Sequence, residues 1–203
     1  MSVASVLLFD LGGVLIHTRG FESIKELLAA SGQPEVGDGQ SLRDRWLGSP
    51  SVRDFELGRL TAQEFAARFV QEWALPITPE AFLEDLTGWI ERPYPGAEEL
   101  LATLRRGYRV CCFSNCNELH WEMMASFLRN FDLSFSSHLL GCIKPDEEAF
   151  RAVLGLLEVA PGAVRFLDDS RANVVGAQKV GIKGFLVHGP EEARRVLQQE
   201  GLL

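Results

Sequence analysis

The sequence predicts an α/β protein with a doubly wound parallel sheet and a helical cap inserted after the first strand. In the C-terminal part, short apolar runs alternate with amphipathic stretches, which is typical of strands and helices in such a sheet. Another apolar run, residues 3–9, also has the pattern of a buried strand, and a segment with almost entirely helical patterning, residues 20–92, follows it. We therefore expect a core domain formed by residues 1–16 and 93–203 and a cap formed by residues 17–92.

The helical segment carries local signals for where its helices begin. Residues 21–30 are amphipathic. Thr61 and Glu64 have the spacing of a capping box, and Thr78 followed by Pro79 is a second helix start. The aromatic residues expected in the cap core are Trp46, Trp73 and Trp89.

The core segment repeats one strand–helix pattern. The expected strands are residues 109–115, 164–169 and 181–187. The expected helices are residues 96–106, 146–157 and 173–181. In an open parallel sheet, ligands bind outside the carboxyl ends of the strands, so polar residues that follow these strands are the candidates for a functional site.

Composition and charge exclude several classes of protein. The 203 residues carry a formal net charge of −8, which gives no electrostatic support for binding nucleic acid or anionic membranes. We find no signal-peptide pattern and no apolar segment of transmembrane length. The four cysteines lack metal-type spacing and are expected to be reduced, packing thiols. We expect a cytoplasmic protein, monomeric or homodimeric.

Four polar positions follow the predicted strands or lie in the loops between them. They are Asp10, Ser114 with Asn115, Lys144, and the pair Asp168 and Asp169. Taken singly, most of them are as well explained by turns or helix caps. The acidic pair is harder to explain in that way, because adjacent carboxylates repel unless a cation or separate partners hold them.

The order of these positions resembles the haloacid dehalogenase superfamily, whose hydrolases use an aspartate nucleophile. The motifs are "FDLGGVL", "FSNCNELH", "LGCIKPDEEAFRAVL" and "FLDDSRANVVGAQKVGI". The resemblance covers about the whole chain and is greatest to small sugar-1-phosphate phosphatases and to the N-terminal phosphatase domain of soluble epoxide hydrolase. It implies the helical cap that the patterning indicates independently.

The resemblance also implies a reaction and a metal. Asp10 would attack phosphorus and form an aspartyl-phosphate that water then cleaves. Mg²⁺ would be held by Asp10, by the backbone carbonyl of Gly12 and by Asp169, with Asp168 as a further ligand or as the holder of a metal-bound water.

The remaining motif residues would bind the substrate. Ser114 and the backbone N–H of Asn115 would donate hydrogen bonds to the phosphoryl oxygens, and Lys144 would offset negative charge. Gly13 would let the loop approach the phosphate closely. Arg59 lies between two predicted cap helices, where it would touch the substrate or remain a solvated loop charge.

Position 12 departs from the family pattern. Most phosphatases of the family have an aspartate there, which protonates the leaving oxygen and later activates water, whereas this chain has Gly12. Either the substrate has a good leaving group, or another residue or water handles the proton. His17 and His120 are candidates, although a structural role is favoured for each. Asn173 orients the acidic pair or caps a helix.

The sequence thus favours a Mg²⁺-dependent phosphatase acting on a small phosphorylated metabolite, in particular a sugar phosphate. Two alternatives stay open. A 2-haloacid dehalogenase needs no general acid, which suits Gly12, but leaves the acidic pair unexplained. A catalytically degenerate binding or regulatory module would fit the missing acid but not the intact Asp10, Lys144 and Asp169.

Overall fold

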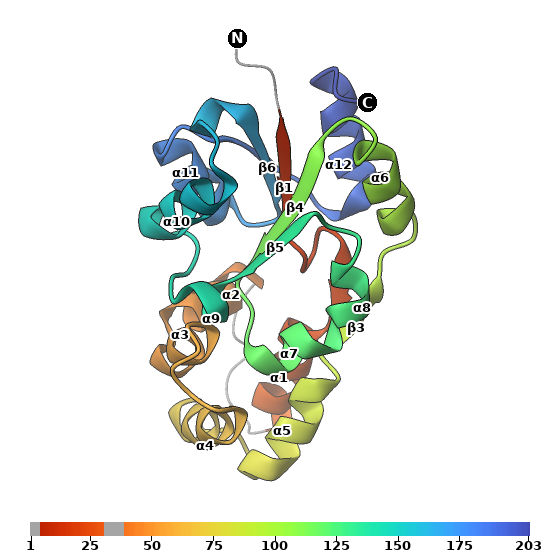
Figure 1. Ribbon diagram of the computed structural model, residues 1–203. Coiled ribbons are helices and arrows are strands. Elements are labelled where there is room, and N and C mark those ends of the chain that lie inside the picture. The colour runs from red at the N-terminus through yellow and green to blue at the C-terminus, as the bar shows by residue number, and fades with distance from the viewer. Residues whose placement is uncertain (1–4, 31–38) are drawn as a thin grey trace.

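A five-stranded parallel sheet forms the centre of the computed structural model, which describes residues 5–30 and 39–203 (Figure 1). The strand order is β5-β4-β1-β6-β7, so the first strand is central. Phe9 at the end of β1 lies in register with Cys112 on one side and Leu167 on the other. The strands are β1 (Val6–Phe9), β4 (Arg109–Ser114), β5 (Leu133–Ser136), β6 (Val164–Asp168) and β7 (Lys183–Leu186).

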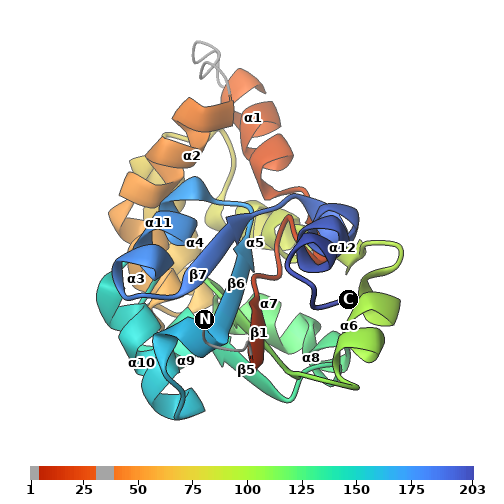
Figure 2. The ribbon, with the colours of Figure 1, turned by 90° about the horizontal axis from the view of Figure 1, so that it is seen from above.

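Helices cover both faces of this sheet, as Figure 2 shows from above. One face packs against α6 (Ala97–Leu104) and α12 (Gly189–Gln199), and the other against α10 (Glu147–Leu157) and α11 (Arg171–Lys179). Successive residues of a strand point to opposite faces. All four cysteines are free. The predicted doubly wound architecture is confirmed.

The segment between β2 (Ile16–Thr18) and β3 (Ile90–Pro93) contains five helices in its described part and has its own aromatic core. The capping box of Thr61 and Glu64 and the N-cap of Thr78 form as predicted. Among the core rings, Phe65, Phe69 and Phe82 lie within 6 Å of one another, centroid to centroid. The helices are α1 (Gly20–Ala30), α2 (Gly39–Gly48), α3 (Pro50–Glu56), α4 (Ala62–Glu72) and α5 (Pro79–Thr87).

The predicted tryptophan core of the cap is confirmed. Trp73 and Trp89 are buried in the aromatic cluster, and Trp46 packs against it. Their rings belong to one continuous set of edge-to-face and tilted contacts with Trp46 at its centre. Such contacts stabilise a pair by about 0.5–1.5 kcal/mol beyond the area that they bury.

Several short elements escaped the sequence patterns. An antiparallel ribbon, β2 (Ile16–Thr18) with β3 (Ile90–Pro93), joins the cap to the core, and the expected boundaries after residues 16 and 92 fall in it. The edge strand β5 was also missed. Runs of three or four residues are too short to show a period. The other short elements are α7 (Glu118–Met123), α8 (Ala125–Leu128), α9 (Ser137–Leu140) and a 3₁₀ turn, Pro161–Ala163.

Two further observations complete the comparison with the sequence. The first predicted strand begins at Val6, and the part of that prediction on residues 3 and 4 lies outside the described residues. Across the described ranges, every helix is too short or too polar to cross a membrane.

Candidate active site

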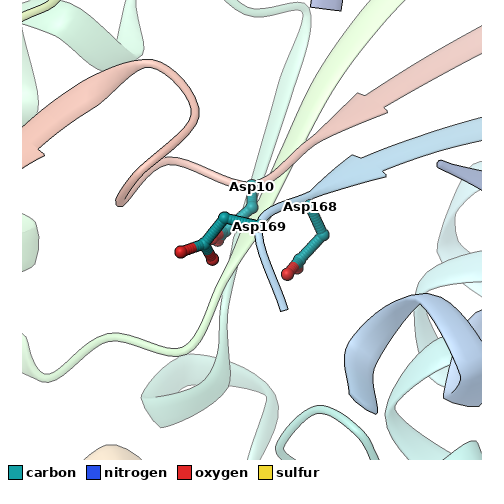
Figure 3. Close-up of side chains that lie close together, drawn as sticks. All are labelled: Asp10, Asp168 and Asp169. Carbon is teal, nitrogen blue, oxygen red and sulfur yellow. The ribbon is translucent and has the colours of Figure 1, made fainter. Parts of the chain in front are cut away.

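Three carboxylates meet at the carboxyl ends of β1 and β6, next to the end of β4. Asp10 follows β1, Asp168 is the last residue of β6, and Asp169 comes next (Figure 3). One oxygen from each lies within 4.8 Å of the others. The three strands are neighbours in the sheet, so its topology brings together residues more than 150 positions apart.

Lys144 places a positive charge inside this cluster. Its side chain is 1% exposed. The Nζ atom donates to Oδ1 of Asp10 at 2.9 Å, to Oδ2 of Asp168 at 2.8 Å and to the carbonyl of Phe113 at 2.8 Å. All three ammonium protons therefore have acceptors, which is what a buried lysine requires.

The electrostatics of the cluster keep this lysine charged. Burial alone would lower the pKa of Lys144, but the carboxylates of Asp10 and Asp168 outweigh it and raise the pKa above its ordinary value. Burial, together with the charges of Asp168 and Asp169, raises the pKa of Asp10 to about 7 against the lowering effect of the Lys144 ammonium. The protein alone thus leaves negative charge at Asp10 incompletely compensated.

The two acids of the pair have different surroundings. Oδ1 of Asp168 accepts hydrogen bonds from the backbone N–H of Ser170 at 2.8 Å and from Nδ2 of Asn173 at 3.0 Å, while Oδ2 accepts from Lys144. Both oxygens of Asp168 therefore accept hydrogen bonds from protein donors. The helix N-cap is Ser170, and Asn173 orients the acid, which decides between its two predicted roles.

Asp169 instead faces the cap. Arg43 of α2 donates to Oδ2 of Asp169 at 3.0 Å, and the two side chains are 33% and 14% exposed. Sequence patterns gave no signal for Arg43, because its partner is 126 residues away and on another domain. Lys144 and Arg43 offset two of the three carboxylate charges within the described part of the site.

The donor set fits a hard divalent cation such as Mg²⁺. Mg²⁺ prefers oxygen ligands and is commonly bound by one or two carboxylates with several waters. Asp10 and Asp169 are the partly exposed carboxylates of the cluster, and Asp168 is fully buried and engaged. Asp10 and Asp169 are thus available as two carboxylate ligands, and one of the three negative charges has no partner among the described residues of the site.

The two glycines after Asp10 differ in backbone conformation and in the space around them. Gly13 has φ +71°, and a Cβ there would lie 2.6 Å from Oδ2 of Asp169. Its N–H donates to the carbonyl of Ile16 at 3.1 Å, so it is engaged within the loop instead of pointing at a phosphate. Gly13 makes room for Asp169. Gly12 has ordinary φ, and a Cβ there would meet only Thr18 at 3.5 Å.

Ser114 is the last residue of β4 and Asn115 follows it, beside the cluster. Ser114 is buried and lines the adjacent cavity. The Asn115 side chain holds the Lys144 loop through both its atoms: Nδ2 donates to the carbonyl of Lys144 and Oδ1 accepts from its N–H, each at 2.9 Å. The side chain of Asn115 is thus a clamp on the Lys144 loop, and phosphate binding by the backbone N–H of Asn115 stays a prediction.

A cavity of about 190 Å³ lies between the cap and the core, beside the carboxylate cluster. Gly12, Ser114 and Asn115 line it from the core. The opposite side is mainly apolar and comes from the cap. Its cap-derived residues include Phe21, Ile24, Trp46, Val52, Phe55 and Trp89.

Glu56 is the cavity residue that sequence reasoning missed. It ends α3, lines the cavity and accepts a hydrogen bond from the Trp46 side chain. Burial raises its pKa to about 7. A glutamate at a helix end is ordinarily solvated, and only the docking of the cap shows where it points.

Arg59 is not brought to the cavity. Its side chain is 61% exposed and pairs with Asp54 on the cap surface at 3.3 Å. The chain turns at Gly58, which has φ +71°, so the residue before this turn faces the core and the residue after it faces solvent. The prediction that Arg59 contacts substrate therefore gives way to its alternative, a solvated loop charge.

Neither histidine offers a free proton to the site. Nε2 of His120 donates to the carbonyl of Leu86 at 2.8 Å, and Nδ1 accepts from Asn117 at 3.1 Å. Burial lowers the pKa of His120, so it is a neutral, structural side chain. His17 lies in β2, stacks on Tyr94 at 4.1 Å between centroids and faces Glu91.

The fold and the site together define a class of enzyme, an α/β hydrolase with a helical cap inserted after the first strand. A sequence profile of the haloacid dehalogenase-like hydrolases matches residues 4–181. The chain belongs to this family, and its relatives include proteins named as phosphatases.

Relatives differ in how much of their length they share with this chain. Mouse bifunctional epoxide hydrolase 2 is 28% identical over 52% of the chain, which spans only 20% of that protein. A sesquiterpene phosphatase from Aspergillus oryzae is 28% identical, with 88% of this chain and 87% of the relative covered. A phosphatase from Mycobacterium tuberculosis is 27% identical, with 96% and 91% covered.

Solved structures share the whole architecture. A haloacid dehalogenase family enzyme from Bacteroides thetaiotaomicron, solved as a magnesium complex, superposes with a TM-score of 0.76 at 23% identity, covering 97% of this chain and all of the other. A family hydrolase from Porphyromonas gingivalis gives a TM-score of 0.76 at 25% identity, with 98% of each chain covered. These similarities show the fold, cap included.

Proposed function

We propose that this protein is a Mg²⁺-dependent phosphatase that hydrolyses a small phosphate monoester through an aspartyl-phosphate on Asp10. The observation that carries the proposal is the arrangement of the buried Lys144 ammonium between Asp10 and Asp168, with Asp169 beside them. This arrangement holds the Asp10 carboxylate next to cavity-lining Leu11 and Gly12, partly exposed and oriented, as a nucleophile must be.

Four residues of the core have separate roles in the reaction. A carboxylate oxygen of Asp10 attacks phosphorus in line with the leaving oxygen, and the P–O bond to the organic group breaks. Lys144 holds Oδ1 of Asp10 and offsets negative charge as the phosphoryl group arrives. Ser114 and the N–H of Asn115 supply hydrogen bonds to the phosphoryl oxygens. Water then attacks phosphorus, and Asp10 is released as a carboxylate.

Asp10 and Asp169 would hold the magnesium ion, with the Gly12 carbonyl as the third protein ligand that the family pattern implies. Bound there, the cation offsets the repulsion between two anionic reactants. Asp168 serves Lys144 and Asn173 instead, because its oxygens are already engaged. Arg43 competes for Asp169, so metal binding and the cap–core ion pair are coupled.

The cavity favours a substrate whose organic group has an apolar surface. Beyond the phosphate-binding residues its wall is mainly aromatic and aliphatic, contributed by residues such as Phe21, Trp46 and Trp89. A sugar would leave many hydroxyl groups without partners against such a wall. The sugar phosphate expected from the sequence stays a prediction, and the sesquiterpene phosphatase among the relatives supports the apolar alternative.

A panel of monophosphates, aromatic, prenyl-like and sugar, assayed with Mg²⁺ and with chelator, tests the proposal. We expect phosphate release only with Mg²⁺, fastest for the apolar substrates. Acid quenching during turnover should leave phosphate on Asp10, and Asp10→Asn should abolish both signals while keeping the fold. Glu84→Gln, an exposed cap change, is the control that retains activity.

The two alternatives give different results in the same assays. Halide release from 2-haloacids without metal would select the dehalogenase and overturn the phosphatase. Inertness toward every phosphate, without any phosphoenzyme, would select the binding module. Turnover by Asp10→Asn close to that of the unmodified protein would remove the nucleophile assignment.

A further inference from the structure

The proposed reaction has a gap in its proton balance. When the P–O bond breaks, the leaving oxygen of an alkyl phosphate carries a charge that a proton donor must neutralise, and such assistance is typically worth about 10²–10⁴-fold in rate. Position 12 carries no side chain that can donate, because it is Gly12. The donor must come from elsewhere on the cavity wall.

Glu56 is the only carboxylic acid among the described residues that line this cavity. It faces the same space as Gly12 and Ser114, but from the cap. A group on the cap is well placed to meet the leaving oxygen, because the nucleophile and phosphate are held by the core and the organic group extends away from Asp10 in an in-line reaction.

Several contacts hold the end of α3, and with it Glu56, on the core. The carbonyl of Glu56 accepts a hydrogen bond from Oγ of Ser137 at 2.5 Å, and Ser137 in turn accepts from the N–H of Cys116 at 3.0 Å, two residues after Ser114. Gly58 approaches so closely that a Cβ there would lie 2.7 Å from the carbonyl of His138. These contacts fix the position of residues 56–58 on the core.

A second connection lies one turn earlier in α3. Arg53 pairs with Asp146 at 2.5 Å, and Asp146 lies two residues after Lys144. The last turn of α3 is thus tied to the loop that follows Ser114 and to the loop before α10, which carries Lys144. Groups fixed in this way hold the geometry that proton transfer requires.

The charges around Glu56 suit a proton donor. Burial raises its pKa to about 7; the hydrogen bond from Trp46 and the charges of Lys144 and Arg53 lower it, and the charge of Asp10 raises it. Its carboxyl thus lies within electrostatic range of both the nucleophile and its lysine. Near neutral pH a substantial fraction is protonated, which matches a group that alternates between acid and base.

We propose that Glu56 replaces the missing acid at position 12 and is the proton donor and acceptor of the phosphatase reaction. The inference rests on the proposed function. In the first step the Glu56 carboxyl gives its proton to the leaving oxygen as the P–O bond breaks. In the second, the carboxylate takes a proton from the water that attacks the aspartyl-phosphate, which regenerates the acid and the Asp10 carboxylate.

The test compares leaving groups in the 203-residue protein with Mg²⁺. The ratio of kcat/KM for p-nitrophenyl phosphate to that for a simple alkyl phosphate reports the phosphorylation step alone. We expect Glu56→Gln to raise this ratio about 100-fold, the lower end of typical general-acid effects, because only the alcohol needs the proton. Glutamine keeps the shape and the acceptor for Trp46, and Glu84→Gln controls for loss of a cap charge.

Two further measurements keep the test decisive. With p-nitrophenyl phosphate, Glu56→Gln should accumulate phosphate on Asp10, because the base for the second step is lost. Adding Gly12→Asp to Glu56→Gln should lower the ratio again, since a side chain at position 12 meets only Thr18, at an ordinary contact distance of 3.5 Å.

The outcomes separate the two proposals. An unchanged ratio in a folded Glu56→Gln protein that still forms the phosphoenzyme would overturn the role of Glu56 and leave the phosphatase intact. Failure of the unmodified protein to turn over either substrate or to carry phosphate would overturn the proposed function and this inference with it.

Discussion

Replacing Gly13 with alanine should damage the metal site through one contact. Gly13 has φ +71°, a conformation that costs an alanine about 1–2 kcal/mol. Its new Cβ would also lie 2.6 Å from Oδ2 and 2.9 Å from Cγ of Asp169, so this carboxylate must move. The movement disturbs the ion pair with Arg43, which is partly exposed and contributes on the order of 1 kcal/mol. The expected loss in the free energy of unfolding is about 2–3 kcal/mol.

Gly141→Ala is the matched control for the backbone term. Gly141 has φ +67°, and a Cβ there would meet nothing within 4 Å, so this variant should lose only about 1–2 kcal/mol. The difference between the variants isolates the contact with Asp169.

Urea unfolding with and without Mg²⁺ measures both effects. At a concentration 100 times its Kd, a ligand stabilises the folded state by about 2.7 kcal/mol. We expect this gain in the unmodified protein and in Gly141→Ala, and a much smaller one in Gly13→Ala. Equal losses and equal Mg²⁺ responses in the two variants would refute the reasoning that Gly13 makes room for a metal ligand.

Two other predictions concern buried charges. Lys144→Met should lower the free energy of unfolding at pH 7 by about 3–5 kcal/mol, because Asp10 and Asp168 lose their buried cation. The control Lys183→Met, at an exposed pair with Glu200, should cost at most about 1 kcal/mol. Similar losses for the two variants in urea unfolding would contradict the prediction for Lys144. Burial raises the pKa of Glu56 in the folded protein from 4.5 to about 7. The contribution of Glu56 to the free energy of unfolding is therefore fully present below pH 4.5 and falls by up to about 3 kcal/mol as the pH rises to 7. Glu56→Gln should flatten that part of the stability–pH curve of the metal-free protein, and a curve as steep as that of Glu84→Gln would count against the burial of Glu56.

Local patterns in the sequence were sufficient for the framework of the fold. The apolar runs gave four of the five strands of the parallel sheet, and the signals at Thr61 and Thr78 gave two helix starts. These features depend on periodicity and on hydrogen bonds between residues a few positions apart. The strand ends then indicated Asp10, Lys144 and the acidic pair as the site. A rule of topology, that ligands bind at the carboxyl ends of parallel strands, was enough to group them.

The division of labour inside the site was decided only by the tertiary structure. Asp168 and Asp169 are adjacent in sequence and equivalent in pattern, yet one is buried against Lys144 and the other faces Arg43 of the cap. Glu56 and Arg59 lie three residues apart, and the turn between them sends one to the cavity and the other to solvent. The pairs that decide these roles join residues 24 to 134 positions apart, across strands or between cap and core. Periodicity and capping act within a few residues, so the sequence alone determines which residues can carry charge, and only the packing of the cap on the core determines which charges meet.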